Sequence, residues 1–91
     1  MVRCIAIDDE PMALRQIKSY IERTEQLELV AVCRSAREAQ EVLKTTNVDL
    51  LYVDINMPDM NGLDFVRSTD GMHYIVFTTA HPEFAIEGFK L

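Results

Sequence analysis

Short apolar runs alternate with segments of helical periodicity along the chain, and this alternation limits the possible folds more than any other feature. Four runs have strand-like character: residues 2–7, 27–33, 48–54 and 74–78. After the first run, Leu14, Ile17 and Ile21 recur at helical spacing with polar residues between them. Strands that alternate with helices predict a parallel sheet with both faces covered, and nearly continuous apolar strands agree with that burial. We therefore expect an α/β fold with a doubly wound parallel sheet.

Caps and chain breakers place the expected helices. Ser35 and Glu38 have the spacing of a capping box, which predicts a helix start after the second strand. Residues 56–62 are rich in breakers and predict a loop, followed by a short helix over residues 63–69. Residues 82–89 begin with a proline and carry apolar residues at helical spacing, so they predict a last helix.

Composition narrows the possible functions. The chain has 91 residues, which suits one domain, and its nine basic and fifteen acidic side chains give a net charge of −6. Nucleic-acid backbones require clustered Lys and Arg, so this charge argues against DNA contact by these residues. No apolar run approaches the roughly 20 residues of a membrane span, and the N-terminus does not read as a signal peptide. Cys4 and Cys33 are far apart and are expected to be reduced core residues, which favours a cytoplasmic location.

Polar side chains gather at the ends of three expected strands, where a parallel sheet places its ligand sites. They are Asp8, Asp9 and Glu10 after the first strand, Asp54 at the end of the third, and Thr78 and Thr79 at the end of the fourth. Carboxylates that are brought together repel one another unless a cation is present. Because the donors are oxygens with no His or Cys beside them, the pattern favours Mg²⁺ over Zn²⁺.

Asp54 is the candidate nucleophile. A carboxylate at the end of a buried strand, facing acids across a cleft, is able to attack phosphorus and form an aspartyl phosphate. Thr79 is placed to donate a hydrogen bond to a phosphoryl oxygen. Simpler interpretations stay open, because Asp54 could only cap the following loop. The acids at residues 8–10 could likewise only cap the helix that starts at Pro11.

Three segments together resemble the receiver domain of response regulators in two-component signalling. They are residues 5–11 (IAIDDEP), residues 50–63 (LLYVDINMPDMNGL) and residues 75–80 (IVFTTA). The resemblance implies a flavodoxin-like receiver fold with strand order 2-1-3-4. It also implies that residues 1–91 form one receiver domain, that the chain takes phosphate from a sensor histidine kinase, and that it is not an enzyme acting on external substrates.

The same resemblance assigns roles to particular residues. Asp54 would be the phosphoacceptor, and Thr79 would be the switch residue whose hydroxyl moves toward the phosphoryl group. Asp8 and Asp9 would hold Mg²⁺ together with Asp54 and the backbone carbonyl of Asn56. Residues 76–89 resemble receivers joined to a LytTR-type DNA-binding domain, which implies a transcription regulator whose contact with DNA is made only by that output domain.

One departure from the receiver pattern leads to further expectations. Receivers have a fifth βα unit with a Lys followed by Pro, whereas the lysines here precede Ser19, Thr45 and Leu91. Lys90 is expected within the last helix, so the domain is expected to be incomplete at its C-terminus and to lack its output domain. We then expect impaired phosphorylation. We also expect self-association through the exposed edge of the strand at residues 74–78.

Three other functions are alternatives to a receiver domain. A phosphatase would keep Asp54 as nucleophile, but such enzymes carry a second aspartate where this chain has Asn56. A binding module would use the acids only as caps and a face as a docking surface. A flavin-binding protein fits worst, because the loop after the first strand lacks the Ser, Thr and Gly residues that cradle a phosphate.

Overall fold

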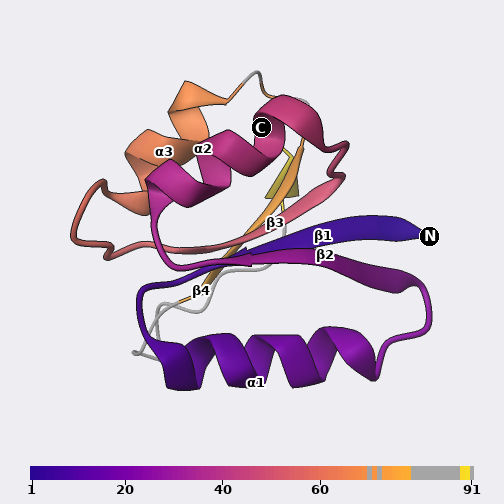
Figure 1. The fold of residues 1–91 in the computed structure, drawn as a ribbon. Helices are drawn as coiled ribbons and strands as arrows, with labels where there is room; N and C mark the ends of the chain where they lie inside the picture. The colour runs from indigo at the N-terminus through magenta and orange to yellow at the C-terminus, as the bar shows by residue number, and fades with distance from the viewer. Residues whose placement is uncertain (70, 72, 79–88, 91) are drawn as a thin grey trace.

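The computed structural model describes residues 1–69, 71, 73–78, 89 and 90 (Figure 1). Its elements are β1 (Val2–Ile7), α1 (Pro11–Glu22), β2 (Leu27–Cys33), α2 (Ala36–Thr45), β3 (Leu50–Asp54), α3 (Gly62–Ser68), β4 (Tyr74–Thr78) and β5 (Phe89–Lys90). Four strands are parallel in the order β2-β1-β3-β4, and β5 pairs antiparallel with β4. The predicted parallel sheet and its strand order 2-1-3-4 are confirmed.

The helices cover both faces of the sheet. α1 lies against one face, and α2 and α3 lie against the other (Figure 1). α1 begins with Pro11 at its first turn, where the fixed backbone angle of proline suits a helix, and it buries Leu14 and Ile21. α1 packs mainly against β1 and β2, so β3 and β4 are less covered on this side.

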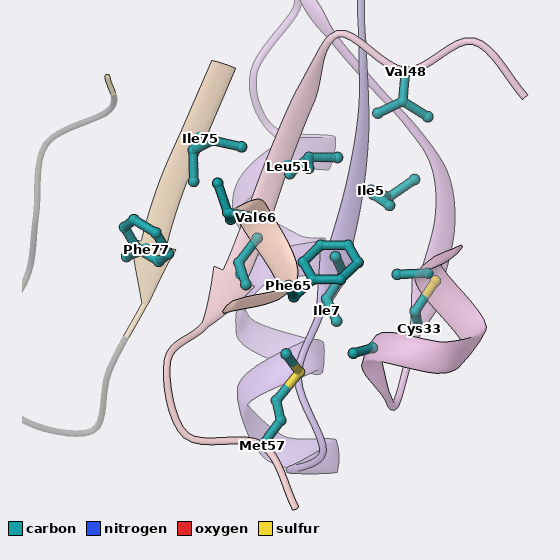
Figure 2. Packing of buried hydrophobic residues seen from close by; sticks show 13 residues of the cluster. Ile5, Ile7, Cys33, Val48, Leu51, Met57, Phe65, Val66, Ile75 and Phe77 are labelled. Carbon is teal, nitrogen blue, oxygen red and sulfur yellow. The ribbon is translucent and has the colours of Figure 1, made fainter. Parts of the chain in front are cut away.

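The main core lies between the sheet and the pair α2 and α3 (Figure 2). Alternate residues of β1, β3 and β4 point into it, because successive side chains of a strand face opposite sides of a sheet. The buried members include Ile5, Ile7, Leu51, Val53, Ile75 and Phe77 from the strands and Ala36, Ala39, Phe65 and Val66 from the helices. Phe65 is the largest of the fully buried side chains in the described part of the chain, so it anchors the short helix α3.

The capping box predicted at the start of α2 is present with one difference. Ser35 Oγ accepts a hydrogen bond from Glu38 N at 3.1 Å, as expected. The Glu38 carboxylate reaches back to Arg34 N at 2.6 Å, one residue before the N-cap. Both bonds satisfy backbone N–H groups at the start of the helix.

The structure corrects two expectations about the C-terminal region. Phe89 and Lys90 lie in β5, not in a last helix, and residues 79–88 lie outside the described residues. The pairing of β5 with Tyr74 and Ile75 also covers part of the β4 edge that was expected to be open. The physical reason is that an edge strand presents unpaired backbone groups, which a short antiparallel segment satisfies.

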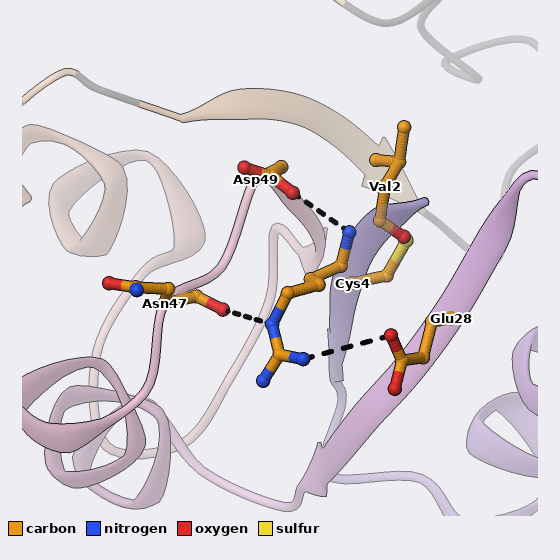
Figure 3. A network of polar contacts seen from close by, with 6 residues as sticks. Val2, Cys4, Glu28, Asn47 and Asp49 are labelled. Atoms are coloured by element: carbon orange, nitrogen blue, oxygen red, sulfur yellow. Dashed lines mark hydrogen bonds and ion pairs between the residues drawn. The ribbon is translucent and has the colours of Figure 1, made fainter.

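Polar contacts of Arg3 link segments at the amino ends of the strands, and Figure 3 labels its three partner residues. Its backbone N donates to Asp49 Oδ2 at 2.9 Å, and its Nε donates to the backbone oxygen of Asn47 at 2.8 Å. The guanidinium also lies 3.7 Å from the Glu28 carboxylate on β2. This network ties β1 and β2 to the segment before β3, far from the carboxyl ends of the strands.

Candidate functional site

Three carboxylates meet at the carboxyl ends of the two central strands. Asp8 and Asp9 follow β1, and Asp54 ends the neighbouring strand β3. One carboxylate oxygen from each of the three lies within 4.8 Å of the others. The sheet therefore brings together residues that are 45 or more positions apart in the sequence, as the strand-end pattern predicted.

Asp8 is positioned by the turn from β1 into α1. Its side chain is only 5% exposed, and Oδ1 accepts a hydrogen bond from Glu10 N at 2.9 Å. Glu10 holds the N-cap position of α1, and its side chain makes no capping hydrogen bond. The interpretation of these acids as helix caps alone is therefore not supported, and two carboxylates are left facing Asp54.

Asp54 is held by the loop that follows it. Its Oδ1 accepts a hydrogen bond from Asn56 N at 3.2 Å, so the residue does cap this loop as well as facing Asp8 and Asp9. Gly62 packs against the backbone of Asp54, and Gly62 N donates to the Ile55 backbone oxygen at 2.7 Å. A Cβ atom at Gly62 would lie 2.3 Å from the Asp54 backbone oxygen, so this close approach requires glycine.

The electrostatics of the cluster favour a bound cation. Burial, followed by the nearby Asp8 carboxylate, raises the pKa of Asp54 to about 6. Burial is also the main cause that raises the pKa of Asp8, and the charge of Asp9 adds to it. Desolvated like charges stabilise the protonated forms of acids, and a divalent cation removes that repulsion. Carboxylate oxygens are the donors that Mg²⁺ prefers, so the donor set fits this ion.

An open groove runs from the carboxylates along α1 toward β4. Asp8, Asp9, Glu10 and Asp54 are its acidic lining residues, and the other lining residues include Tyr20, Tyr52, Val76 and Thr78. Thr78 pairs in register with Asp54 on the neighbouring strand. Its buried hydroxyl has no hydrogen-bond partner among the described residues. Thr79, the predicted switch residue, lies outside the described residues.

Sequence reasoning missed one residue that supports the site. Asp59, in the loop after Asp54, accepts hydrogen bonds from Ala36 N and Arg37 N at the start of α2. No local pattern could reveal this contact, since the partners are 22 and 23 positions apart. Asn61 lies at the end of the same predicted loop. Its side chain caps α3 by accepting from Leu63 N at 2.8 Å.

The family model described as the response regulator receiver domain matches residues 4–91. The transcriptional regulatory protein BtsR of Escherichia coli (strain K12) is 35% identical over 92 residues, which cover 99% of this chain and 38% of that protein. The sensory transduction protein LytR of Staphylococcus saprophyticus is 31% identical over 93 residues, covering 99% of this chain and 37% of that protein. The chain thus spans less than two fifths of the length of these curated relatives.

Solved structures give the same fold. The MaeR response regulator bound to beryllium trifluoride has a TM-score of 0.80 at 24% identity, covering 89% of this chain and 69% of that chain. A chain from the complex of the P1 domain of CheA3 with CheY6 from R. sphaeroides has a TM-score of 0.75 at 28% identity, covering 88% and 64%. Within the described part of this chain, no helix has the length and apolar character needed to cross a membrane.

Proposed function

Because the chain belongs to the response regulator receiver domain family, we propose that it is a phosphoacceptor that takes a phosphoryl group onto Asp54 from a sensor histidine kinase. The observation that carries this proposal is the convergence of Asp8, Asp9 and Asp54, whose ligand oxygens lie within 4.8 Å of one another. A structural cap would need only one of these carboxylates.

The proposed reaction is a displacement at phosphorus. An Asp54 oxygen forms a bond to phosphorus while the bond from phosphorus to the donor histidine nitrogen breaks, and its electron pair stays on that nitrogen. Asp54 must be ionised to attack, and a pKa of about 6 leaves it mostly ionised at pH 7. The hydrogen bond from Asn56 N fixes one carboxylate oxygen, so the other is the candidate nucleophile.

Mg²⁺ is the proposed cofactor. Asp8, Asp9 and Asp54 would hold it together with the backbone carbonyl of Asn56, and the ion would offset negative charge on the phosphoryl oxygens. Water later attacks phosphorus, and Asp54 leaves as the free carboxylate. In this account the chain catalyses only its own phosphorylation and dephosphorylation.

The output is a shift between two conformations. Thr79 is the proposed switch residue, on the basis of its position in the receiver pattern, where it directly follows Thr78 in the sequence. BtsR is named a transcriptional regulatory protein, and by that likeness we infer that phosphorylation controls a DNA-binding output domain in the cytoplasm. The net charge of −6 suits a segment that does not itself contact DNA.

Thermal unfolding with Mg²⁺ and beryllofluoride, a phosphoryl analogue, tests the proposal. A ligand at 100 times its dissociation constant stabilises a folded protein by about 2.7 kcal/mol, so the wild-type unfolding temperature should rise by several degrees. Asp54→Asn should abolish the rise. Asp64→Asn is the matched control, because Asp64 is an exposed carboxylate on α3 paired with Arg67. Equal stabilisation of the wild type and Asp54→Asn would refute the assignment of Asp54.

A further inference from the structure

Asp59 connects the loop of the phosphoacceptor to a helix that is remote in sequence. Its Oδ1 accepts a hydrogen bond from Ala36 N at 3.3 Å, and its Oδ2 accepts one from Arg37 N at 3.1 Å. These N–H groups belong to the first turn of α2 and have no partner within the helix. Ser35 satisfies a third N–H, that of Glu38, so the two capping side chains have separate partners.

The loop between Asp54 and α3 is fixed at several points. Gly62 N bonds to the Ile55 backbone oxygen at 2.7 Å, and Met57 is only 7% exposed within the main core. Asp59 supplies a further anchor, on the side of α2. Asn56 lies within this anchored segment, and its backbone N orients the Asp54 carboxylate at 3.2 Å. The loop thus contacts the Asp54 carboxylate through Asn56 N, so a shift of the loop would alter the orientation of this side chain.

We propose that Asp59 is a positioning residue, which holds the loop against α2 so that Asn56 and Asp54 present their oxygens in the arrangement that binds the metal ion. The proposal rests on the function proposed above. Asp59 is exposed and is not one of the three clustered carboxylates, so it acts through the loop and not as a ligand.

A simple helix cap is the competing explanation, and Ser35 provides the matched control. Ser35→Ala removes a cap from the same helix end but leaves the loop anchored. Asp59→Ala removes two capping bonds and, with them, the anchor between the loop and α2. If Asp59 acts only as a cap, both substitutions should lower the unfolding temperature and neither should change the response to Mg²⁺.

The experiment measures initial rates of phosphoryl uptake by intact mass across a Mg²⁺ series, with a small acyl phosphate as donor. All variants are compared at a temperature where circular dichroism shows them folded. For Asp59→Ala we expect the Mg²⁺ concentration at half-maximal rate to be about tenfold higher. This is the lower end of the losses of metal affinity seen when groups that support metal ligands are removed. Ser35→Ala should change this concentration less than about twofold, which is within the scatter expected for an uninvolved site.

Asp59→Asn provides a second test that preserves side-chain shape. It keeps one acceptor oxygen, so its Mg²⁺ dependence should lie between those of the wild type and Asp59→Ala, even if Asp59→Ala folds poorly. The positioning role alone would be overturned if Asp59→Asn and Asp59→Ala both kept the Mg²⁺ dependence of the wild type. It would also be overturned if Ser35→Ala changed the Mg²⁺ dependence as much as Asp59→Ala does. Absence of uptake by the wild type would instead overturn the proposed function, and the positioning role with it.

Discussion

Burial and the Asp8 carboxylate raise the pKa of Asp54 from 3.8 to about 6, so ionisation of this residue opposes folding when no cation is present. Between these two values the folded chain binds a proton that the unfolded chain has released. The contribution of Asp54 to the free energy of unfolding therefore increases as the pH falls from about 7 toward 4. The same carboxylate that suits phosphoryl transfer is thus a source of instability in the metal-free chain.

Asp54→Asn should raise the unfolding temperature of the metal-free protein at pH 7.5, by a few degrees on the scale expected for about 1 kcal/mol in a domain of this size. The asparagine oxygen still accepts from Asn56 N, while the charge is removed. As the pH is lowered from 7.5 to 5 in the presence of EDTA, the unfolding temperature should rise more for the wild type than for the variant. A lower unfolding temperature for Asp54→Asn at pH 7.5 would contradict the electrostatic account.

Gly62→Ala tests the packing behind Asp54. The added methyl would meet the Asp54 backbone oxygen at 2.3 Å, so the loop or the end of β3 must shift. We expect a loss of about 1–3 kcal/mol in urea unfolding, as in other overpacked sites, and a weaker response to Mg²⁺ with beryllofluoride. Leu63→Ala, at the next position on α3 and 42% exposed, is the control and should behave almost as the wild type.

Among the secondary-structure elements, local patterns succeeded where hydrophobic periodicity and capping agree. The predicted strands at residues 2–7, 27–33 and 74–78 have the observed bounds, and Ser35 caps α2 as expected. The strand predicted from Val48 instead starts at Leu50, because burial of Val48 in the core does not require ladder pairing. The expectation that Phe89 lies in a helix was wrong, because Phe89 pairs with the edge of β4, and that edge is a feature of the tertiary structure.

Phe65→Ala should be among the most damaging substitutions in α3. Phe65 is fully buried between α3 and the sheet, and truncation of such a side chain costs about 3–5 kcal/mol. Tyr20→Ala is a control of similar size, because Tyr20 on α1 is 69% exposed, and it should cost less than about 1 kcal/mol. Urea unfolding followed by circular dichroism measures both. Equal losses would mean that α3 is not held by Phe65.

At the scale of the whole molecule, the candidate site was predictable because it follows from topology. Parallel strands place their carboxyl ends at one edge, so Asp8, Asp9 and Asp54 were expected to meet, and they do. The support of the site was not predictable in the same way. The contact of Asp59 with α2 depends on how the loop is folded over the helix, which no periodicity or short motif encodes.

Self-association through β4 remains a prediction. The described pairing with β5 involves Tyr74 and Ile75, at the start of β4, and Val76 is the next residue along the same strand. We expect the mass measured by light scattering to rise with concentration, and Val76→Lys to reduce that rise because charges oppose edge pairing. Val32→Lys on the opposite edge strand β2 is the control. A monomer mass at all concentrations would contradict the prediction.

Intact mass after incubation with Mg²⁺ and a small acyl phosphate measures whether Asp54 accepts a phosphoryl group at the acidic cluster. We expect the wild type to gain a single phosphoryl group and Asp54→Asn to gain none. Asp64→Asn, whose carboxylate lies on the surface of α3, should gain one as the wild type does. A gain that persists in Asp54→Asn would contradict the account, as would a wild-type chain that gains no mass.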